Sequence, residues 1–152
     1  MKNVLFSSLA ALSFLAANPA GAHCQIPCGI YDDNNVLQSM HTDFVTIEKA
    51  SKTILELQAD PSENAHQLTR WIMNKESHAQ SIQEKVLNYF LAQRLKPATD
   101  EAGMKEYNEK LQTCHAVIVA AMKCKQSTDA EAVESLHKEL HKFEQLFAEK
   151  SE

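Results

Sequence analysis

Four stretches of this 152-residue sequence repeat apolar residues at helical spacing, and short polar breaks separate them. Residues three, four and seven positions apart share one face of an α-helix, whereas strands need strict alternation, which is not found here over any useful length. Each stretch must bury its apolar face against the others, which predicts an all-α fold. The expected buried positions are Val36, Met40, Phe44, Ile47, Ile54 and Leu57; Leu68, Ile72, Ala79, Ile82, Val86 and Phe90; Met104, Tyr107, Leu111, Cys114, Ile118 and Ala121; and Val133, Leu136, Leu140, Phe143 and Phe147.

Capping residues predict where these helices begin. Asp32 or Asp33 can cap the first helix, and the third is expected to begin near Asp100. Residues 60–63 and 128–131 both have the spacing of a capping box. Because the connections are short, each helix must run antiparallel to the one before it. The sequence therefore predicts an antiparallel up-down four-helix bundle with an extended N-terminal arm.

Residues 1–22 have the pattern of a secretory signal peptide. Lys2 is a short basic region, an apolar run follows, and small residues end the segment at Ala22. The run is about 14 residues, and a membrane-spanning helix needs about 20. We therefore expect cleavage after Ala22, export to the periplasm or the outside, and no membrane attachment after processing. Residues 23–152 would then form one domain.

The charge of the chain limits its partners. The formal net charge is −5 at pH 7, and loss of Lys2 with the leader makes it one unit more negative. No basic cluster occurs in the sequence. We therefore expect no binding to nucleic acid or to an anionic membrane.

Ligand-type residues are concentrated in residues 23–32. Cleavage after Ala22 would free the amine of His23 beside its imidazole, next to the backbone nitrogen and thiol of Cys24. Cys28 can return a second thiolate if the chain turns at Pro27 and Gly29. A compact nitrogen and sulfur site favours copper or nickel, because zinc prefers a tetrahedron and calcium prefers oxygen. The segment is therefore a candidate metal-binding hook.

This hook resembles that of the nickel superoxide dismutases, whose pattern is His-Cys-x-x-Pro-Cys-Gly-x-Tyr. Every fixed position is matched between His23 and Tyr31. The resemblance implies that the amine and imidazole of His23, the backbone nitrogen and thiolate of Cys24, and the thiolate of Cys28 bind a nickel ion. It also implies that Pro27 follows a cis bond and that Tyr31 stands at the mouth of the site.

The same resemblance implies the reaction and the assembly. Superoxide would be converted to dioxygen and hydrogen peroxide by one-electron Ni(II)/Ni(III) cycling, in a homohexamer of four-helix bundles. Three further positions bear on how closely the sequence follows the family pattern. Gln25 replaces an aspartate of the best-known pattern, and Lys96 resembles a Lys-Pro element that could attract the anion. The carboxylate that orients the imidazole aligns with Ser39, with His41 and Asp43 as near alternatives.

Other interpretations stay open from the sequence. The hook could bind copper or nickel without catalysis, or Cys24 and Cys28 could form a disulfide. Cys114 and Cys124 would lie about 15 Å apart along one helix, too far for a disulfide, which needs α-carbons within about 7 Å. We therefore expect two buried thiols.

Several other side chains are expected to be structural. His137 and His141 have the spacing of a two-histidine metal face but lack the accompanying Glu, so a surface or interface role is expected. Trp71 is either partly buried packing or a subunit contact. Tyr89 and Phe90 are expected in the core.

Overall fold

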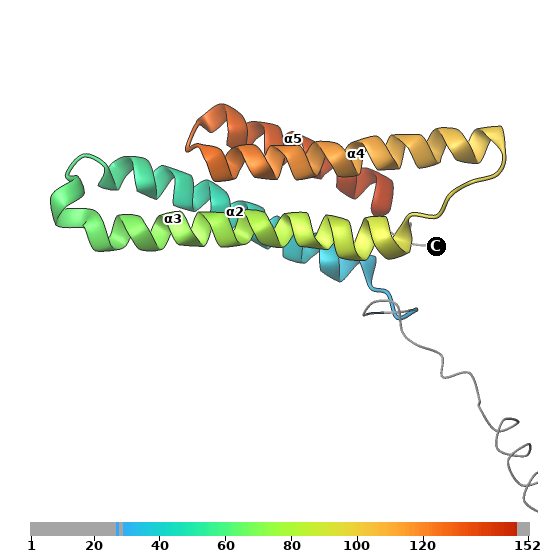
Figure 1. Ribbon diagram of the computed structural model, residues 1–152, viewed down its shortest axis with the longest axis horizontal. Helices are drawn as coiled ribbons and strands as arrows, with labels where there is room; N and C mark the ends of the chain where they lie inside the picture. Colours follow the sequence, from blue (N-terminus) through green and yellow to red (C-terminus); the bar gives the residue numbers. More distant parts are fainter. Residues whose placement is uncertain (1–26, 28, 149–152) are drawn as a thin grey trace, which may run out of the picture.

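The computed structural model describes residues 27 and 29–148, and these form a helical bundle (Figure 1). The described residues contain no strand. Successive helices run in opposite directions, so the all-α, up-down, antiparallel architecture is confirmed. The helices are α2 (Asp33–Leu57), α3 (Pro61–Glu84) with its π-helical continuation η2 (Lys85–Arg94), α4 (Glu101–Gln126) and α5 (Ala130–Phe147).

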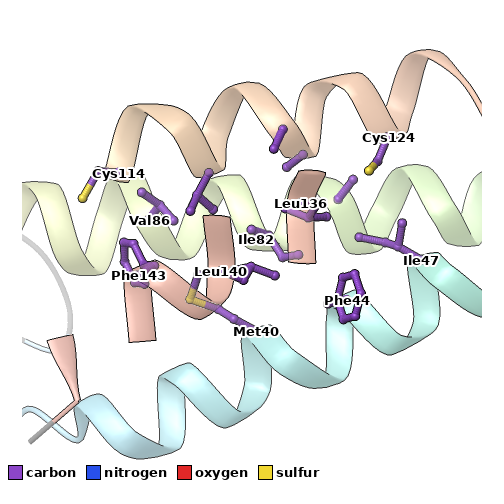
Figure 2. Packing of buried hydrophobic residues seen from close by; sticks show 14 of the residues in the cluster. Met40, Phe44, Ile47, Ile82, Val86, Cys114, Cys124, Leu136, Leu140 and Phe143 are labelled. Carbon is purple, nitrogen blue, oxygen red and sulfur yellow. The ribbon is translucent and has the colours of Figure 1, made fainter. Parts of the chain in front are cut away.

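One apolar seam holds the helices together. α2 packs on α3, α3 on α4, and α4 on α5, and α5 also contacts α2. Figure 2 shows side chains from every helix meeting in this seam. Phe90 of η2 lies edge-on to Phe143 and Phe147 of α5, with ring centroids 4.8 and 4.9 Å apart. All five positions predicted for the last helix are buried.

The helix starts follow the predicted capping residues, with one exception. The carboxylates of Asp32, Asp60 and Asp100 accept backbone N–H groups in the first turns of α2, α3 and α4. The capping box predicted at residues 128–131 is not formed. Asp129 precedes α5, but its side chain makes no capping hydrogen bond. Packing of Val133 and Leu136 stabilises the start of this helix instead.

Three predicted core residues are on the surface. Ile72, Met104 and Leu111 are between 38% and 43% exposed. In α4 the buried face runs through Cys114 and Ala121, so Leu111 lies at the side of the packed seam. The apolar face of a helix can be wider than the strip its neighbours cover, and spacing alone does not show where that strip ends.

A buried lysine joins α3 to the end of α4. Lys75 is 3% exposed, and its Nζ donates to the backbone oxygens of Cys124, Lys125 and Ser127, the last two at 3.0 Å. The last carbonyl groups of a helix have no partner within the helix and carry partial negative charge. The ammonium group therefore satisfies the C-terminal end of α4 where the chain turns into α5.

We expect Lys75→Met to lower the free energy of unfolding by about 1–3 kcal/mol, because the buried carbonyls lose their donor. Urea denaturation followed by circular dichroism measures this. Lys52→Met is the control, since Lys52 forms only an exposed pair with Glu48, and the change should be within about 0.5 kcal/mol. Equal stability of the Lys75 variant and the wild type would contradict this role.

Candidate metal centre

The hook enters the bundle at the end where η2 stops and α2 starts (Figure 1). Of the four predicted site residues, Tyr31 is described, whereas His23, Cys24 and Cys28 lie outside the described residues. The described part of the hook is therefore its base, Pro27 and residues 29–32. It shows how the chain leaves the bundle and what holds Tyr31.

A tight turn forms the base of the hook. The backbone N–H of Ile30 donates to the carbonyl oxygen of Pro27 at 3.0 Å, which closes the turn. Gly29 occupies its third position with φ of +81°, the value expected there in a type II turn. Residues with a Cβ rarely adopt this conformation. The expectation that Gly29 gives the backbone a path closed to other residues is confirmed.

Two groups hold the ring of Tyr31. Tyr89 lies edge-on to it, with ring centroids 5.8 Å apart and an interplanar angle of 89°. The guanidinium carbon of Arg94 lies 4.6 Å from the ring centroid, within cation–π range. Tyr89 in turn packs against Phe90 at 4.9 Å. A continuous series of aromatic contacts therefore joins Tyr31 to the core.

A buried carboxylate lies beneath these rings. Asp33, the first residue of α2, accepts three hydrogen bonds from Arg94 at 2.6–2.9 Å and one from the hydroxyl of Tyr89 at 2.8 Å. The same hydroxyl accepts the backbone N–H of Asp32 at 2.8 Å. Burial, and then the hydrogen bond to Asp33, raise the pKa of Tyr89 to about 12. Tyr89 is therefore neutral at physiological pH, and its hydroxyl donates a hydrogen bond to Asp33.

The π-helical form of η2 brings Tyr89 and Arg94 together. Its last hydrogen bond, from Leu95 N to Phe90 O at 2.8 Å, spans five residues. Residues five apart point about 140° away from each other in an α-helix, but they share a face where the bonds run from i to i+5. Tyr89 and Arg94 therefore both reach Asp33.

Sequence reasoning missed part of this cluster. Tyr89 is buried, as expected, but its hydroxyl also contacts the base of the hook. Asp33 was considered only as a cap, and Arg94 was not singled out. Tyr89 and Arg94 are five positions apart, so α-helical spacing does not place them on one face. The sequence signal for this cluster is Asp33, a second carboxylate next to the expected capping residue.

The residue that would orient the imidazole of His23 was expected among Ser39, His41 and Asp43, and His23 itself lies outside the described residues. Ser39 and His41 are exposed on α2. Asp43 is buried, and its carboxylate is bonded to His78 at 2.7 Å, Ser81 at 2.8 Å and Lys85. These three bonds hold the Asp43 carboxylate against α3 and η2.

A shallow hollow of about 260 Å³ lies beside Arg94. Lys96 and Lys110 also line it, with Tyr107 and Glu106. Glu106 pairs with Lys110 at 2.7 Å. The hollow is therefore lined by more cationic side chains than carboxylates.

No second metal site is found among the described residues, where no group of three His, Cys, Asp or Glu side chains could hold an ion. Cys114 and Cys124 are fully buried, unbridged and separated along α4 (Figure 2), which confirms that prediction. Burial raises the pKa of Cys114 to about 12 and that of Cys124 to about 11. Both are therefore protonated thiols at neutral pH.

His137, His141 and Trp71, which were expected to be structural, lie outside the cluster around Asp33. His137 stacks on Phe44 with ring centroids 4.9 Å apart, and His141 is exposed on α5. Trp71 is partly buried, with the Nζ of Lys49 5.8 Å from its ring centroid. None of the described helices is both long and apolar enough to span a bilayer.

The structure therefore defines a helical-bundle protein in which residues 29–32, at the base of the hook, are anchored at one end. A family model described as nickel-containing superoxide dismutase matches residues 18–151, and the chain belongs to this family. It is an oxidoreductase with nickel as cofactor and superoxide as substrate. Comparison with curated proteins and with solved structures gave no match. Nothing in these findings supports the non-catalytic alternative.

We expect Cys114 and Cys124 to resist alkylation in the folded protein. Their raised pKa values leave almost no thiolate at pH 8. Iodoacetamide treatment of folded and urea-unfolded protein, followed by peptide mass spectrometry, should label these residues only after unfolding. Rapid labelling of either residue in the folded protein would show that α4 does not bury it.

Proposed function

We propose that the nickel centre of this superoxide dismutase is built from the first six residues of a chain cleaved after Ala22. The ligands are the amine and imidazole of His23, the backbone nitrogen and thiolate of Cys24, and the thiolate of Cys28. The observation that carries this proposal is the complete match to the hook pattern from His23 to Tyr31, in a chain that belongs to the family.

The donor chemistry fits nickel. Thiolates and nitrogen donors suit a thiophilic first-row metal that accepts a flat site. The described residues offer no competing group of three ligands. When bound, nickel supplies the one-electron exchange between Ni(II) and Ni(III) that dismutation needs. The chain's own residues then have to hold the ligands, admit superoxide and exclude larger molecules.

Tyr31 would control access to the metal. Its ring is held against Tyr89 and Arg94, so its hydroxyl has a restricted set of positions. Arg94 contacts the ring, and Lys96 lines the hollow beside Arg94. Clefts lined with charge of one sign raise the local concentration of oppositely charged substrates. Because Arg94 is paired with Asp33, Lys96 would supply the charge that attracts superoxide toward Tyr31.

We further propose that the protein is exported and assembles into a homohexamer. The signal-peptide pattern of residues 1–22 supports export. Exposed apolar side chains on the outer faces of α3 and α4, among them Met73, Leu111 and Met122, support a contact between subunits. Sedimentation of the processed protein tests the assembly, and a monomer at micromolar concentration would contradict it.

The ligand set makes a direct prediction. In the processed protein, His23→Ala, Cys24→Ser and Cys28→Ser should each abolish dismutation and nickel retention, because each removes a donor. Helix content should not change, since the bundle core lies in residues 33–147. Superoxide assays, metal analysis and circular dichroism measure the three properties.

A matched control keeps every side chain. A chain with one alanine added before His23 retains the imidazole and both thiols but moves the free amine, so it should lose activity as fully as the substitutions. Full activity of this extended protein would show that the terminal amine is not a ligand.

Charge at the entrance can be tested separately. Lys96→Gln should lower kcat/KM about two- to fivefold at low salt, and the difference should shrink as salt screens the charge. Lys52→Gln, an exposed change on α2, is the control and should have no effect. A salt-independent loss for Lys96→Gln would argue against electrostatic attraction.

A further inference from the structure

Arg94 contacts both a buried carboxylate and the ring at the mouth of the proposed site. Its Nε and Nη2 bond to both oxygens of Asp33, and its guanidinium carbon lies 4.6 Å from the ring centroid of Tyr31. The side chain of Asp33 is 4% exposed and that of Arg94 is 30% exposed. The ion pair is thus mostly withdrawn from water, while Arg94 reaches toward the surface.

The form of the ion pair determines how Arg94 meets the ring. A guanidinium group is planar, and two parallel bonds to one carboxylate fix the direction of that plane. The carboxylate is itself fixed, because Asp33 lies in the first turn of α2 and also accepts a hydrogen bond from Tyr89. The guanidinium therefore cannot rotate without breaking bonds in a buried site, which is costly.

Tyr31 needs such support because it precedes the helix. It lies before the capping residue Asp32, so helical hydrogen bonds do not hold it. The two contacts to its ring come from Tyr89 and Arg94, which belong to η2 rather than to the hook. The orientation of the ring therefore depends on groups supplied by the bundle.

We propose that Asp33 and Arg94 form a positioning pair for Tyr31. The carboxylate aligns the guanidinium, and the guanidinium fixes the plane of the tyrosine ring. This inference rests on the proposed function, in which Tyr31 controls access to nickel. Neither residue touches the metal or superoxide in this role. Their effect on the reaction passes through the phenol.

A conservative substitution separates positioning from charge. Arg94→Lys keeps the positive charge and can still pair with Asp33, but it lacks the planar fork. If charge alone matters, this variant should behave as the wild type does. If alignment matters, kcat/KM should fall about three- to tenfold, because small misplacements near a reacting centre are costly. Asp33→Asn should give a change in the same direction.

A spectroscopic measurement tests the same point without relying on activity. In the processed chain labelled at its tyrosine rings, the NMR signals of Tyr31 should be displaced from their values in the unfolded protein, with or without nickel. Tyr31→Phe assigns them. In Arg94→Lys and Asp33→Asn the signals should move most of the way back to the unfolded values. Circular dichroism checks that these variants stay folded.

Lys75→Met is the control for general loosening. It removes a buried ammonium contact toward the other end of the bundle, so it should lower stability and leave the Tyr31 signals in place. Wild-type signals and wild-type kcat/KM in Arg94→Lys would overturn the proposal. A shift of the Tyr31 signals toward the unfolded values in Lys75→Met, as large as that in Arg94→Lys, would also overturn it.

The two proposals fail in different ways. If Tyr31→Phe leaves kcat/KM unchanged, the role given to Tyr31 in the proposed function is wrong, whatever the spectra show. If Tyr31→Phe lowers kcat/KM while Arg94→Lys has no effect on either the spectrum or the rate, the proposed function stands and the positioning pair does not.

Discussion

Burial of one apolar seam is the interaction on which the rest of this structure depends. Phe90, Phe143 and Phe147 pack at 4.5–4.9 Å near the hook end of the bundle, and they fix η2 relative to α5. Aromatic pairs of this kind contribute beyond the area they bury. Tyr89 is the next residue to Phe90, so the same packing determines where its hydroxyl lies. The polar cluster that anchors the hook is therefore positioned by the core.

The polar cluster joins α2 and η2 to the base of the hook. Asp33 begins α2, Arg94 ends η2, and the two meet where the hook leaves the bundle. A hook that carries its ligands in six residues has no apolar core to orient it. A buried ion pair and two ring contacts supply that orientation. Such pairs add little net stability, because desolvation offsets their attraction, but they can favour one arrangement over others.

Much of the fold could be predicted from the sequence because helical periodicity and capping are local signals. Asp60 and Asp100 cap the expected helices, and the seam of α5 is buried as predicted. The errors have a common physical cause. Ile72 and Leu111 are exposed because spacing shows which face is apolar but not how much of it the neighbouring helices cover.

The candidate site also has a part that could be predicted from the sequence and a part that could not. The hook pattern is contiguous in sequence, so its ligands and the family could be predicted without a structure. The residues that hold Tyr31 could not, because Asp33 and Arg94 are 61 positions apart. Arg94 lies on the same face as Tyr89 because η2 is a π-helix, and the spacing of apolar residues does not predict a π-helix. Apolar periodicity does not predict contacts that depend on tertiary packing or on a local change of helix type.

X-ray absorption at the nickel edge of the processed protein tests the central claim most directly. The account predicts a first shell with two sulfur ligands, from Cys24 and Cys28, and nitrogen ligands beside them. The variant in which both cysteines are replaced by serine should show no nickel edge, because it should not retain the metal. A shell of nitrogen and oxygen alone in the active enzyme would contradict the account.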